Sequence, residues 1–359
     1  MHVEQKIKHV LMTAVQMQAT DIHLMPKVNG YVMKIRAGGT LTGTDSFSIH
    51  EGERMISYLK FTASMDIGEK RKPQSGAFKQ IINGISTSLR ISTLPAIPQK
   101  ESLVIRLLPQ EHVPSLSDLT LFPDTAKKLT SLLNHSTGLV LLSGPTGSGK
   151  STTLYSMIQH CAATLNKHVI TLEDPVEKQH DSLLQIQVNE KAGITYATGL
   201  KAILRHDPDV IMVGEIRDEE TARVAVRSAL TGHLVMSTIH ARDAAGVIGR
   251  LLEFGVTHHE ISQTIVGITA QRLVRIRCPK CGAQCAPHCV HFTRQAIVCE
   301  LLSGRMLTSV LKEVRAGGRH MIYKRLKDEI GKGIAYGYLT QEEWARWVFE
   351  EADDSEKWR

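Results

Sequence analysis

The chain has 359 residues, of which 42% are hydrophobic and 22% charged, as in an ordinary globular protein of two or three domains. It has no apolar run of membrane-spanning length, and residues 1–8 lack the apolar core of a signal peptide, so a helical membrane span is excluded and a cytoplasmic location is expected. The net charge of +7 allows an acidic partner or an anionic membrane surface, although a mildly basic solvated surface explains it equally well.

The first hundred residues predict a small domain that mixes helices and strands. Residues 3–19 are expected to form a helix with one apolar stripe, and residues 51–63 a second helix. Short strands are expected at residues 20–24 and 31–36, because each is apolar and is followed by turn residues.

Two further strands of this domain each carry an arginine. In residues 85–92 apolar side chains alternate with serines and Arg90, and residues 103–108 carry Arg106 as a lone charge on its face. The connection contains two prolines, so we expect it to lie outside the strand ladder. The pattern predicts an antiparallel pair holding two arginines on rigid backbone, either as functional groups or as solvated surface residues.

A proline-containing polar stretch, residues 109–124, is interpreted as a linker. Beyond it, strands alternate with helices, which predicts an α/β domain with a parallel sheet covered by helices. The expected strands are residues 138–143, 168–172, 210–213 and 234–238.

A glycine-rich segment follows the first of these strands. Residues 144–151, Gly-Pro-Thr-Gly-Ser-Gly-Lys-Ser, match the phosphate-binding pattern G-x-x-x-x-G-K-[ST]. The glycines let backbone N–H groups converge on one anion at the start of a helix expected over residues 152–163. Lys150 would reach the β- and γ-phosphates of ATP, and the Ser151 hydroxyl would bind Mg²⁺. A turn without a ligand is the alternative. The predicted nucleotide-binding residues are Gly144, Pro145, Thr146, Gly147, Ser148, Gly149, Lys150, Ser151 and Thr152.

Two later strands end in acidic residues. Glu173 follows an apolar strand that Pro175 terminates, and Glu215 ends a second apolar strand. Ligands bind at the carboxyl edge of open α/β sheets, where an acid can lie beside Mg²⁺ and the attacking water. Gly214 stands where many such strands carry Asp, so the second acid is a variant of that pattern.

Two histidines, His233 and His240, flank the strand at residues 234–238. An extended strand separates them by roughly 3.3 Å per residue, too far for them to share one metal ion. Core or surface histidines are the simpler interpretation, and sensing of the γ-phosphate is the functional one.

Four cysteines lie within a dozen residues: Cys278, Cys281, Cys285 and Cys289. They could enclose Zn²⁺ tetrahedrally, although only the first pair has the standard spacing, and reduced thiols in a small loop are the alternative. Residues 290–359 are expected to be helical, with a capping-box sequence at residues 340–343.

Taken in order, these motifs resemble the secretion ATPases that power type II secretion, type IV pili and competence pseudopili. The resemblance rests on the phosphate loop and on residues 172–177, 207–218 and 231–240. Two flanking segments add to it, Ala-Thr-Asp-Ile-His-Leu at residues 19–24 and Ala-Gln-Arg-Leu-Val-Arg at residues 270–275.

This resemblance implies a PAS-like N-terminal domain, a RecA-like ATPase domain and a homo-hexameric ring that binds ATP at domain or subunit interfaces. We therefore expect a PAS-like α+β domain at residues 1–108, the linker at 109–124, a RecA-like core at 125–277 and a cysteine-rich loop with a helical region at 278–359. It also implies a polytopic membrane platform protein as partner, at the inner face of the cell membrane, and no direct contact with nucleic acid.

The resemblance assigns roles to the candidate residues. Glu173 would be the general base and Glu215 would position the water, although the two could exchange roles. Arg90 and Arg106 match arginines that approach the nucleotide phosphates in this family, and His233 and His240 would couple phosphate state to conformation.

The chain also departs from the family pattern. Ala77 replaces an arginine that is common in the family, so one phosphate contact could be missing. The cysteine segment is compact, and the chain is expected to begin directly at the PAS-like part, whereas larger members carry an extra N-terminal docking domain. Both features resemble the competence-pilus ATPases of Gram-positive bacteria.

The sequence therefore predicts an ATP-hydrolysing motor that assembles a type IV-like competence pilus or pseudopilus for DNA uptake, or drives type II-like secretion. A pilus-retraction ATPase, a DNA-translocating RecA-like ATPase and a regulatory protein that binds ATP without cycling are the alternatives. The cysteine segment argues against retraction, only the basic charge favours DNA, and the two acids argue against a regulatory protein.

Overall fold

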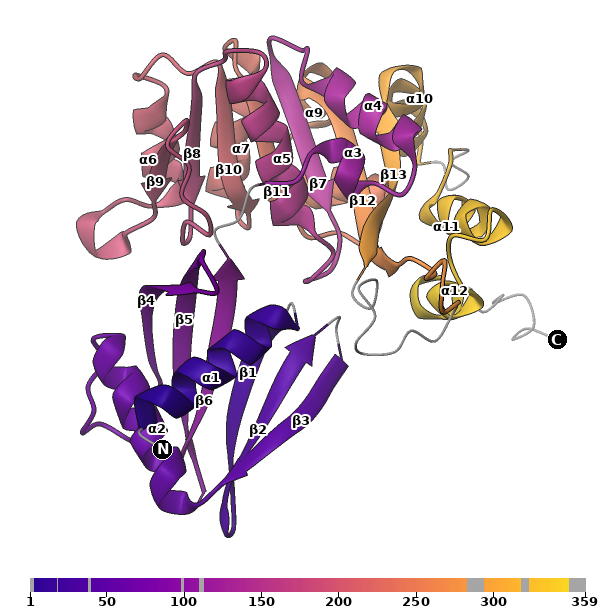
Figure 1. Ribbon diagram of the computed structural model, residues 1–359. Helices are drawn as coiled ribbons and strands as arrows, with labels where there is room; N and C mark the ends of the chain where they lie inside the picture. The colour runs from indigo at the N-terminus through magenta and orange to yellow at the C-terminus, as the bar shows by residue number, and fades with distance from the viewer. Residues whose placement is uncertain are drawn as a thin grey trace, which may run out of the picture. The chain divides into compact units, whose positions relative to one another are not determined.

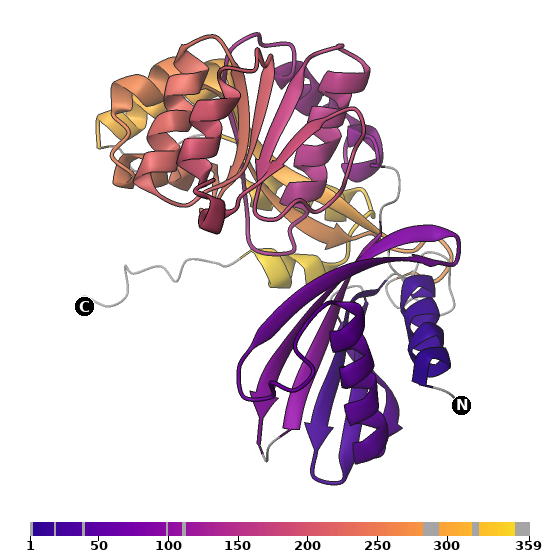
Figure 2. The same ribbon diagram turned by 90° about the vertical axis from the view of Figure 1, so that its left-hand side faces the viewer.

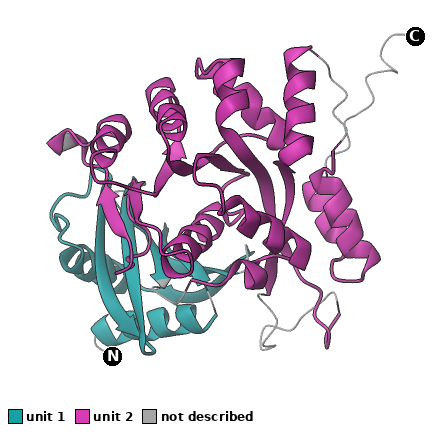
Figure 3. Ribbon diagram, turned by 90° about the horizontal axis from the view of Figure 1, so that it is seen from above, with its two compact units in different colours: residues 1–112 teal, residues 113–359 magenta. Residues whose placement is uncertain are grey.

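The computed structural model describes residues 3–17, 19–37, 40–97, 100–109, 113–282, 294–317 and 323–348. It divides into two compact units, residues 1–112 and residues 113–359 (Figure 3). Each unit has its own sheet and its own hydrophobic core, so the two are described separately.

The first unit contains a six-stranded antiparallel sheet of order β3-β2-β1-β6-β5-β4 within its described residues. The strands are β1 (Ala19–Lys27), β2 (Gly30–Ala37), β3 (Thr40–Phe47), β4 (Gln74–Ile82), β5 (Ile85–Ala96) and β6 (Lys100–Pro109), and the helices are α1 (Val3–Gln16) and α2 (Ile49–Thr62). Both helices cover one face of this sheet (Figure 1).

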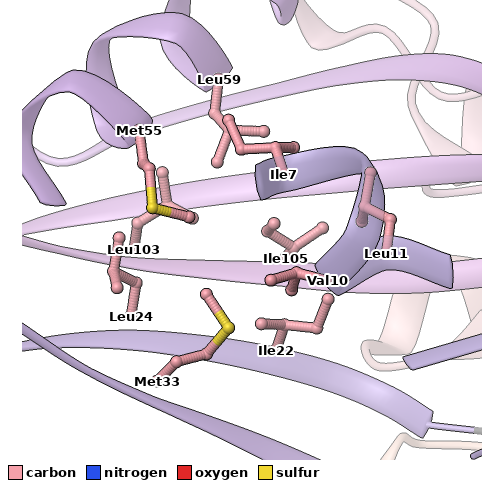
Figure 4. Close-up of a pocket in the computed structure, with 10 residues that line it drawn as sticks. All are labelled: Ile7, Val10, Leu11, Ile22, Leu24, Met33, Met55, Leu59, Leu103 and Ile105. Carbon is pink, nitrogen blue, oxygen red and sulfur yellow. The ribbon is translucent and has the colours of Figure 1, made fainter. Parts of the chain in front are cut away.

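Alternation along the strands decides which face the helices cover. The apolar stripe of α1, which includes Leu11, packs on inward-facing residues such as Ile22 and Ile105. Figure 4 shows these side chains converging on one another. The void that they line is about 10 Å³, room for one water molecule at most. Each fully buried Leu or Ile contributes about 1.5–3 kcal/mol to folding. This interior is a packed core with no space for a ligand.

The predicted antiparallel pair is confirmed, with Leu89 and Ile91 facing the core. The prediction that the prolines lie outside the ladder is wrong for Pro95, which pairs with Glu101 near the end of β5. Pro95 is tolerated because it lies close to the strand end, where the hairpin turns. Strands β3 and β4 were not predicted from the sequence.

The second unit contains a seven-stranded sheet of order β13-β12-β7-β11-β10-β8-β9 within its described residues. All neighbours are parallel except β12 and β13. Its strands are β7 (Gly138–Ser143), β8 (Val169–Glu173), β9 (Leu184–Gln187), β10 (Val210–Ile216), β11 (Leu234–Ile239), β12 (Ile265–Arg275) and β13 (Gln295–Ser303). Its helices are α3 (Leu116–Leu119), α4 (Pro123–Leu132), α5 (Lys150–Ala163), α6 (Tyr196–Ile203), α7 (Glu219–Leu230), α8 (Ala244–Glu253), α9 (His258–Thr264), α10 (Gly304–Arg315), α11 (Leu326–Ala335) and α12 (Gln341–Trp347).

Helices lie on both faces of this sheet (Figure 2). Alternate residues of β7 show why: Leu139 and Leu141 pack toward α7, α8 and α9, whereas Val140 and Leu142 pack toward α4 and α5. A strand buried on both faces appears in the sequence as a continuous apolar run, which explains why β7, β8, β10 and β11 were predicted. Strands β9 and β12 were not predicted.

Three sequence expectations need correction here. The segment expected as a linker divides at residue 112, and its later part joins the second unit because Val113 and Leu116 are buried in that core. Residues 295–303, expected as helix, form strand β13 paired with β12. Helix α12 is present, but the Thr340 side chain makes no capping hydrogen bond.

The helices were also compared with the length of a membrane span. In the part of the chain that the structure describes, none combines the length and apolar character needed to cross a membrane.

Candidate active site

The carboxyl ends of four neighbouring parallel strands meet at one edge of the second sheet. Strand β7 leads into residues 144–151, β8 ends at Glu173, β10 carries Glu215 and β11 is followed by His240. Because parallel strands place their carboxyl ends at the same edge, the fold brings the predicted phosphate loop and both predicted acids to one place.

The phosphate loop connects β7 directly to α5. Gly147 and Gly149 have φ angles of +78° and +84°, left-handed conformations that glycine adopts without strain. Gly149 is the N-cap of α5, so the loop amides and the positive end of the helix dipole face the same space. Ser148 Oγ is buried and has no hydrogen-bond partner among the described residues. A cradle of this kind fits the phosphates of a nucleotide.

Lys150 lies within this loop. Its Nζ donates to the carbonyl oxygens of Gly144 at 2.7 Å and Pro145 at 3.1 Å. Burial lowers the pKa of Lys150, Glu215 opposes that shift, and Arg272 adds to it. The ammonium group therefore lies inside the loop, held by two of its carbonyl oxygens. Ser151, the next residue, lies in the first turn of α5.

Glu173 is buried, with 4% of its surface exposed. Its carboxylate accepts hydrogen bonds from the Tyr155 hydroxyl, from Thr171 Oγ1 at 2.7 Å and from Gln185 Nε2 at 3.2 Å. Tyr155 lies on α5, the helix that begins in the phosphate loop. Burial and the neighbouring Glu173 charge raise the pKa of Tyr155, so its hydroxyl remains a donor. The carboxylate is thus fixed relative to the loop.

Glu215 contacts a basic side chain with each of its oxygens. His240 Nε2 lies 2.8 Å from Oε1, and Arg217 Nε lies 2.5 Å from Oε2. Glu215 is mostly buried, whereas both partners are more than half exposed. The hydrogen bond to Glu215 raises the pKa of Arg217. His240 therefore belongs to the candidate site because it contacts Glu215.

His233 is not brought to this edge of the sheet. It precedes β11, its carbonyl accepts the N–H of Gly138 at 3.1 Å, and its Nδ1 lies 3.1 Å from Ser228 O. Gly138 begins β7, so His233 lies at the amino edge, a strand length of roughly 3.3 Å per residue from the loop. Within its own chain it does not contact the candidate site.

Arg90 and Arg106 lie in the first unit and are direct cross-strand neighbours on the face that the helices leave uncovered. Arg106 Nε donates to Asp21 Oδ1 at 3.0 Å, and the row continues to Arg36 on β2. On the other side the row reaches Ala77, so the arginine that the family commonly has there would lie beside Arg90. The sheet therefore gathers three arginines into one row, with Asp21 between Arg36 and Arg106.

The cysteine segment is described only in part, since Cys285 and Cys289 lie outside the described residues. Cys278 and Cys281 lie in the turn after β12, where the N–H of Cys281 donates to Cys278 Sγ at 3.3 Å. The Cys278 N–H donates to Gly282 O at 3.1 Å, and the Gly282 N–H donates back to Cys278 O at 2.9 Å. An N–H directed at sulfur favours the thiolate that Zn²⁺ binds, so this half of the set fits a zinc site. Within the described ranges no cluster of three or more potential ligands is present.

Sequence reasoning missed several residues of the site. Arg217 lies only two residues after Glu215 in the sequence, and this spacing could have indicated the contact between them. The sequence gave no such indication for Tyr155 and Gln185. Tyr155 lies on helix α5 and Gln185 on the edge strand β9, and only the folded structure brings both to Glu173.

A glycine-rich loop at a helix N-terminus, with two acids at neighbouring strand ends, defines a P-loop nucleotide hydrolase. The family described as Type II/IV secretion system protein matches residues 1–343, so the chain belongs to that family of secretion and pilus ATPases.

Individual relatives agree with that assignment. Competence protein ComGA of Bacillus subtilis (strain 168) is 48% identical over 354 residues, which are 98% of this chain and 99% of that protein. The crystal structure of the pilus retraction motor PilT with bound ADP has a TM-score of 0.68 and 26% identity, covering 98% of each chain. The ATPase DotB of Legionella pneumophila has a TM-score of 0.75 at 23% identity, covering 95% of this chain and 94% of that one, a likeness of fold.

Proposed function

We propose that this chain is an ATP-hydrolysing motor that drives assembly of a competence pilus or pseudopilus. The observation that carries the proposal is the phosphate loop with Glu173 and Glu215 at one sheet edge, in a chain that matches a competence protein over almost its whole length. We assign the first unit as PAS-like and the second as RecA-like, with residues 278–359 as its C-terminal region.

Each residue of the site has a proposed role. The loop amides and Lys150 hold the phosphates of ATP, and Ser151 holds Mg²⁺, which supplies positive charge to the β- and γ-phosphate oxygens when bound. Glu173 takes the proton of the attacking water. Glu215 orients that water, and His240 transmits the state of Glu215 to the β11–α8 connection.

Arg90 and Arg106 are proposed to complete the site from the first unit of the same chain or of a neighbouring subunit. Their guanidinium groups would offset the charge that develops on the transferring phosphoryl group. The row of cations on the open face of the first sheet supports this role.

The motor is proposed to act as a homo-hexamer at the inner face of the cell membrane. Its family is typically hexameric. Its partner would be a polytopic membrane platform protein, which passes the motion of the ring to pilin-like subunits, and no contact with nucleic acid is required.

Retraction is the second candidate function, because the solved structure of the retraction motor PilT covers nearly the whole chain. Deletion of the gene in its host separates the two directions of force. Assembly predicts loss of both surface filaments and DNA uptake, restored by the intact gene. Excess filaments would show that the motor retracts, and normal filaments with lost uptake would instead favour a motor acting on DNA.

Zinc is proposed as a structural ion held by Cys278, Cys281, Cys285 and Cys289. Elemental analysis of the purified protein is expected to find about one zinc per chain, and Cys278→Ser to lower that content. Cys299→Ala is a matched control, because burial raises the pKa of Cys299 to about 12 and keeps it from acting as a thiolate ligand. Zinc-free protein with all cysteines reduced would eliminate this site.

A further inference from the structure

The segment at residues 270–275 contributes no residue to the roles above, yet it lies against the phosphate loop. It forms part of β12, the neighbour of β7, and Ala270 pairs with Ser143 at the point where β7 ends. The next residue, Gln271, is 1% exposed. A buried amide side chain at this position must find hydrogen-bond partners, and the loop provides them.

Gln271 makes two hydrogen bonds to the back of the loop and its helix. Nε2 donates to the Ser148 carbonyl at 2.8 Å and to Thr153 Oγ1 at 3.2 Å. Thr153 Oγ1 in turn donates to the Gly149 carbonyl at 3.1 Å. Gln271 therefore holds two consecutive loop carbonyls, that of Ser148 directly and that of Gly149 through the Thr153 hydroxyl.

Two glycines of the loop pack closely against Gln271. A Cβ atom added to Gly144 would lie 2.5 Å from Gln271 O, and one added to Gly149 would lie 3.4 Å from Gln271 Nε2. Both the start and the end of the loop therefore pack against Gln271 of β12.

The orientation of one peptide group links these contacts to anion binding. In a planar trans peptide, the C=O of Ser148 and the N–H of Gly149 point in opposite directions. Fixing that carbonyl on Gln271 therefore turns the Gly149 N–H to the opposite side of the chain, away from β12. That N–H is one of the donors at the start of α5.

We propose that Gln271 is a positioning residue of the nucleotide site: its amide holds the Ser148–Gly149 peptide with the N–H directed at the phosphates. The inference rests on the assignment of residues 144–152 as the phosphate site. It gives the 270–275 segment a physical role that does not involve touching the nucleotide.

The test replaces Gln271 by Met, a residue of similar length without a donor. The full-length Gln271→Met protein is expected to bind a fluorescent ADP analogue about tenfold more weakly, from the loss of two hydrogen bonds. KM for ATP is expected to rise by about the same factor with little change in kcat, as for lost uniform binding. The matched control is Gln263→Met, at an exposed position on α9.

Thr153→Val is a second variant that keeps the shape and removes the hydroxyl of the same network. It is expected to weaken ADP binding about threefold, the loss of one hydrogen bond. All titrations are made well below the melting temperature of each variant, measured without nucleotide, so that unfolding cannot imitate weaker binding.

The measurements distinguish the positioning role of Gln271 from the phosphate site at residues 144–152 on which that role depends. If the wild-type protein does not bind ADP, the assignment of residues 144–152 as the phosphate site is wrong. A wild-type protein that binds ADP, with Gln271→Met and Thr153→Val binding equally tightly, overturns the role of Gln271 and leaves the site intact. A lower melting temperature with unchanged ADP affinity would assign Gln271 to folding alone.

Discussion

Replacing Lys150 by alanine is expected to abolish ATP hydrolysis. Lys150 Nζ lies in the phosphate loop, bonded to two of its carbonyl oxygens, where a β- or γ-phosphate oxygen would replace them as its partner. Removing a preorganised cation from such a site lowers turnover by at least about 100-fold. The measurement is steady-state phosphate release by the purified full chain with saturating ATP and Mg²⁺.

Lys201→Ala is the matched control for that experiment. Lys201 lies on α6 of the same unit and forms an exposed ion pair with Glu220 at 3.1 Å, an interaction of little stabilising value. The control is expected to retain wild-type activity. Full activity in Lys150→Ala would remove the assignment of residues 144–151 as the phosphate site.

The second large effect is expected from Glu173→Gln. The replacement has nearly the same shape, but its amide cannot take the proton of the attacking water. Loss of a positioned general base costs typically about 10²- to 10⁴-fold in rate. Binding of ATP should persist, since the phosphate loop is unchanged, so the variant is expected to bind nucleotide and not turn it over.

Glu215→Gln provides the comparison that separates the two acids. It weakens the ion pairs to His240 and Arg217 and leaves the Tyr155–Glu173 hydrogen bond in place. Turnover is expected to fall less than in Glu173→Gln, and the exposed Glu220→Gln should behave as wild type. If Glu215→Gln were inactive and Glu173→Gln active, the two acids would have exchanged roles.

The parts of the fold that could be predicted from the sequence are those with strong local signals. Strands β7, β8, β10 and β11 are short apolar runs buried on both faces, and the phosphate loop is defined by its glycines and Lys150. Their common edge follows from parallel topology alone. These signals predicted that the phosphate loop, Glu173 and Glu215 lie at the same edge of the sheet, but they did not distinguish His240 from His233.

Other parts depended on tertiary context. Residues 295–303 are as apolar as a buried helix, and only pairing with β12 makes them a strand. Strand β3 is almost entirely exposed, so no alternation marked it. His233 and His240 were given the same role, yet they lie at opposite ends of one strand, as the sequence had indicated, and only His240 reaches Glu215.

Networks of hydrogen bonds were the least predictable feature. Glu173 is held by residues from α5, β8 and β9, and Gln271 reaches the phosphate loop from β12. Such contacts join residues distant in sequence, and neither periodicity nor spacing encodes them. The segment at residues 270–275 contributed to the family resemblance, but the sequence predicted neither its strand nor the direction of its side chains.

We propose that the phosphates held by the loop are also contacted by arginines of the first unit. A structure of the protein with Mg²⁺ and a non-hydrolysable ATP analogue tests it most directly. We expect the guanidinium groups of Arg90 and Arg106 at hydrogen-bond distance, about 2.7–3.2 Å, from phosphate oxygens bound to Lys150 of the same or a neighbouring subunit. Phosphates seated in the loop with both arginines remote from every nucleotide in the assembly would contradict it.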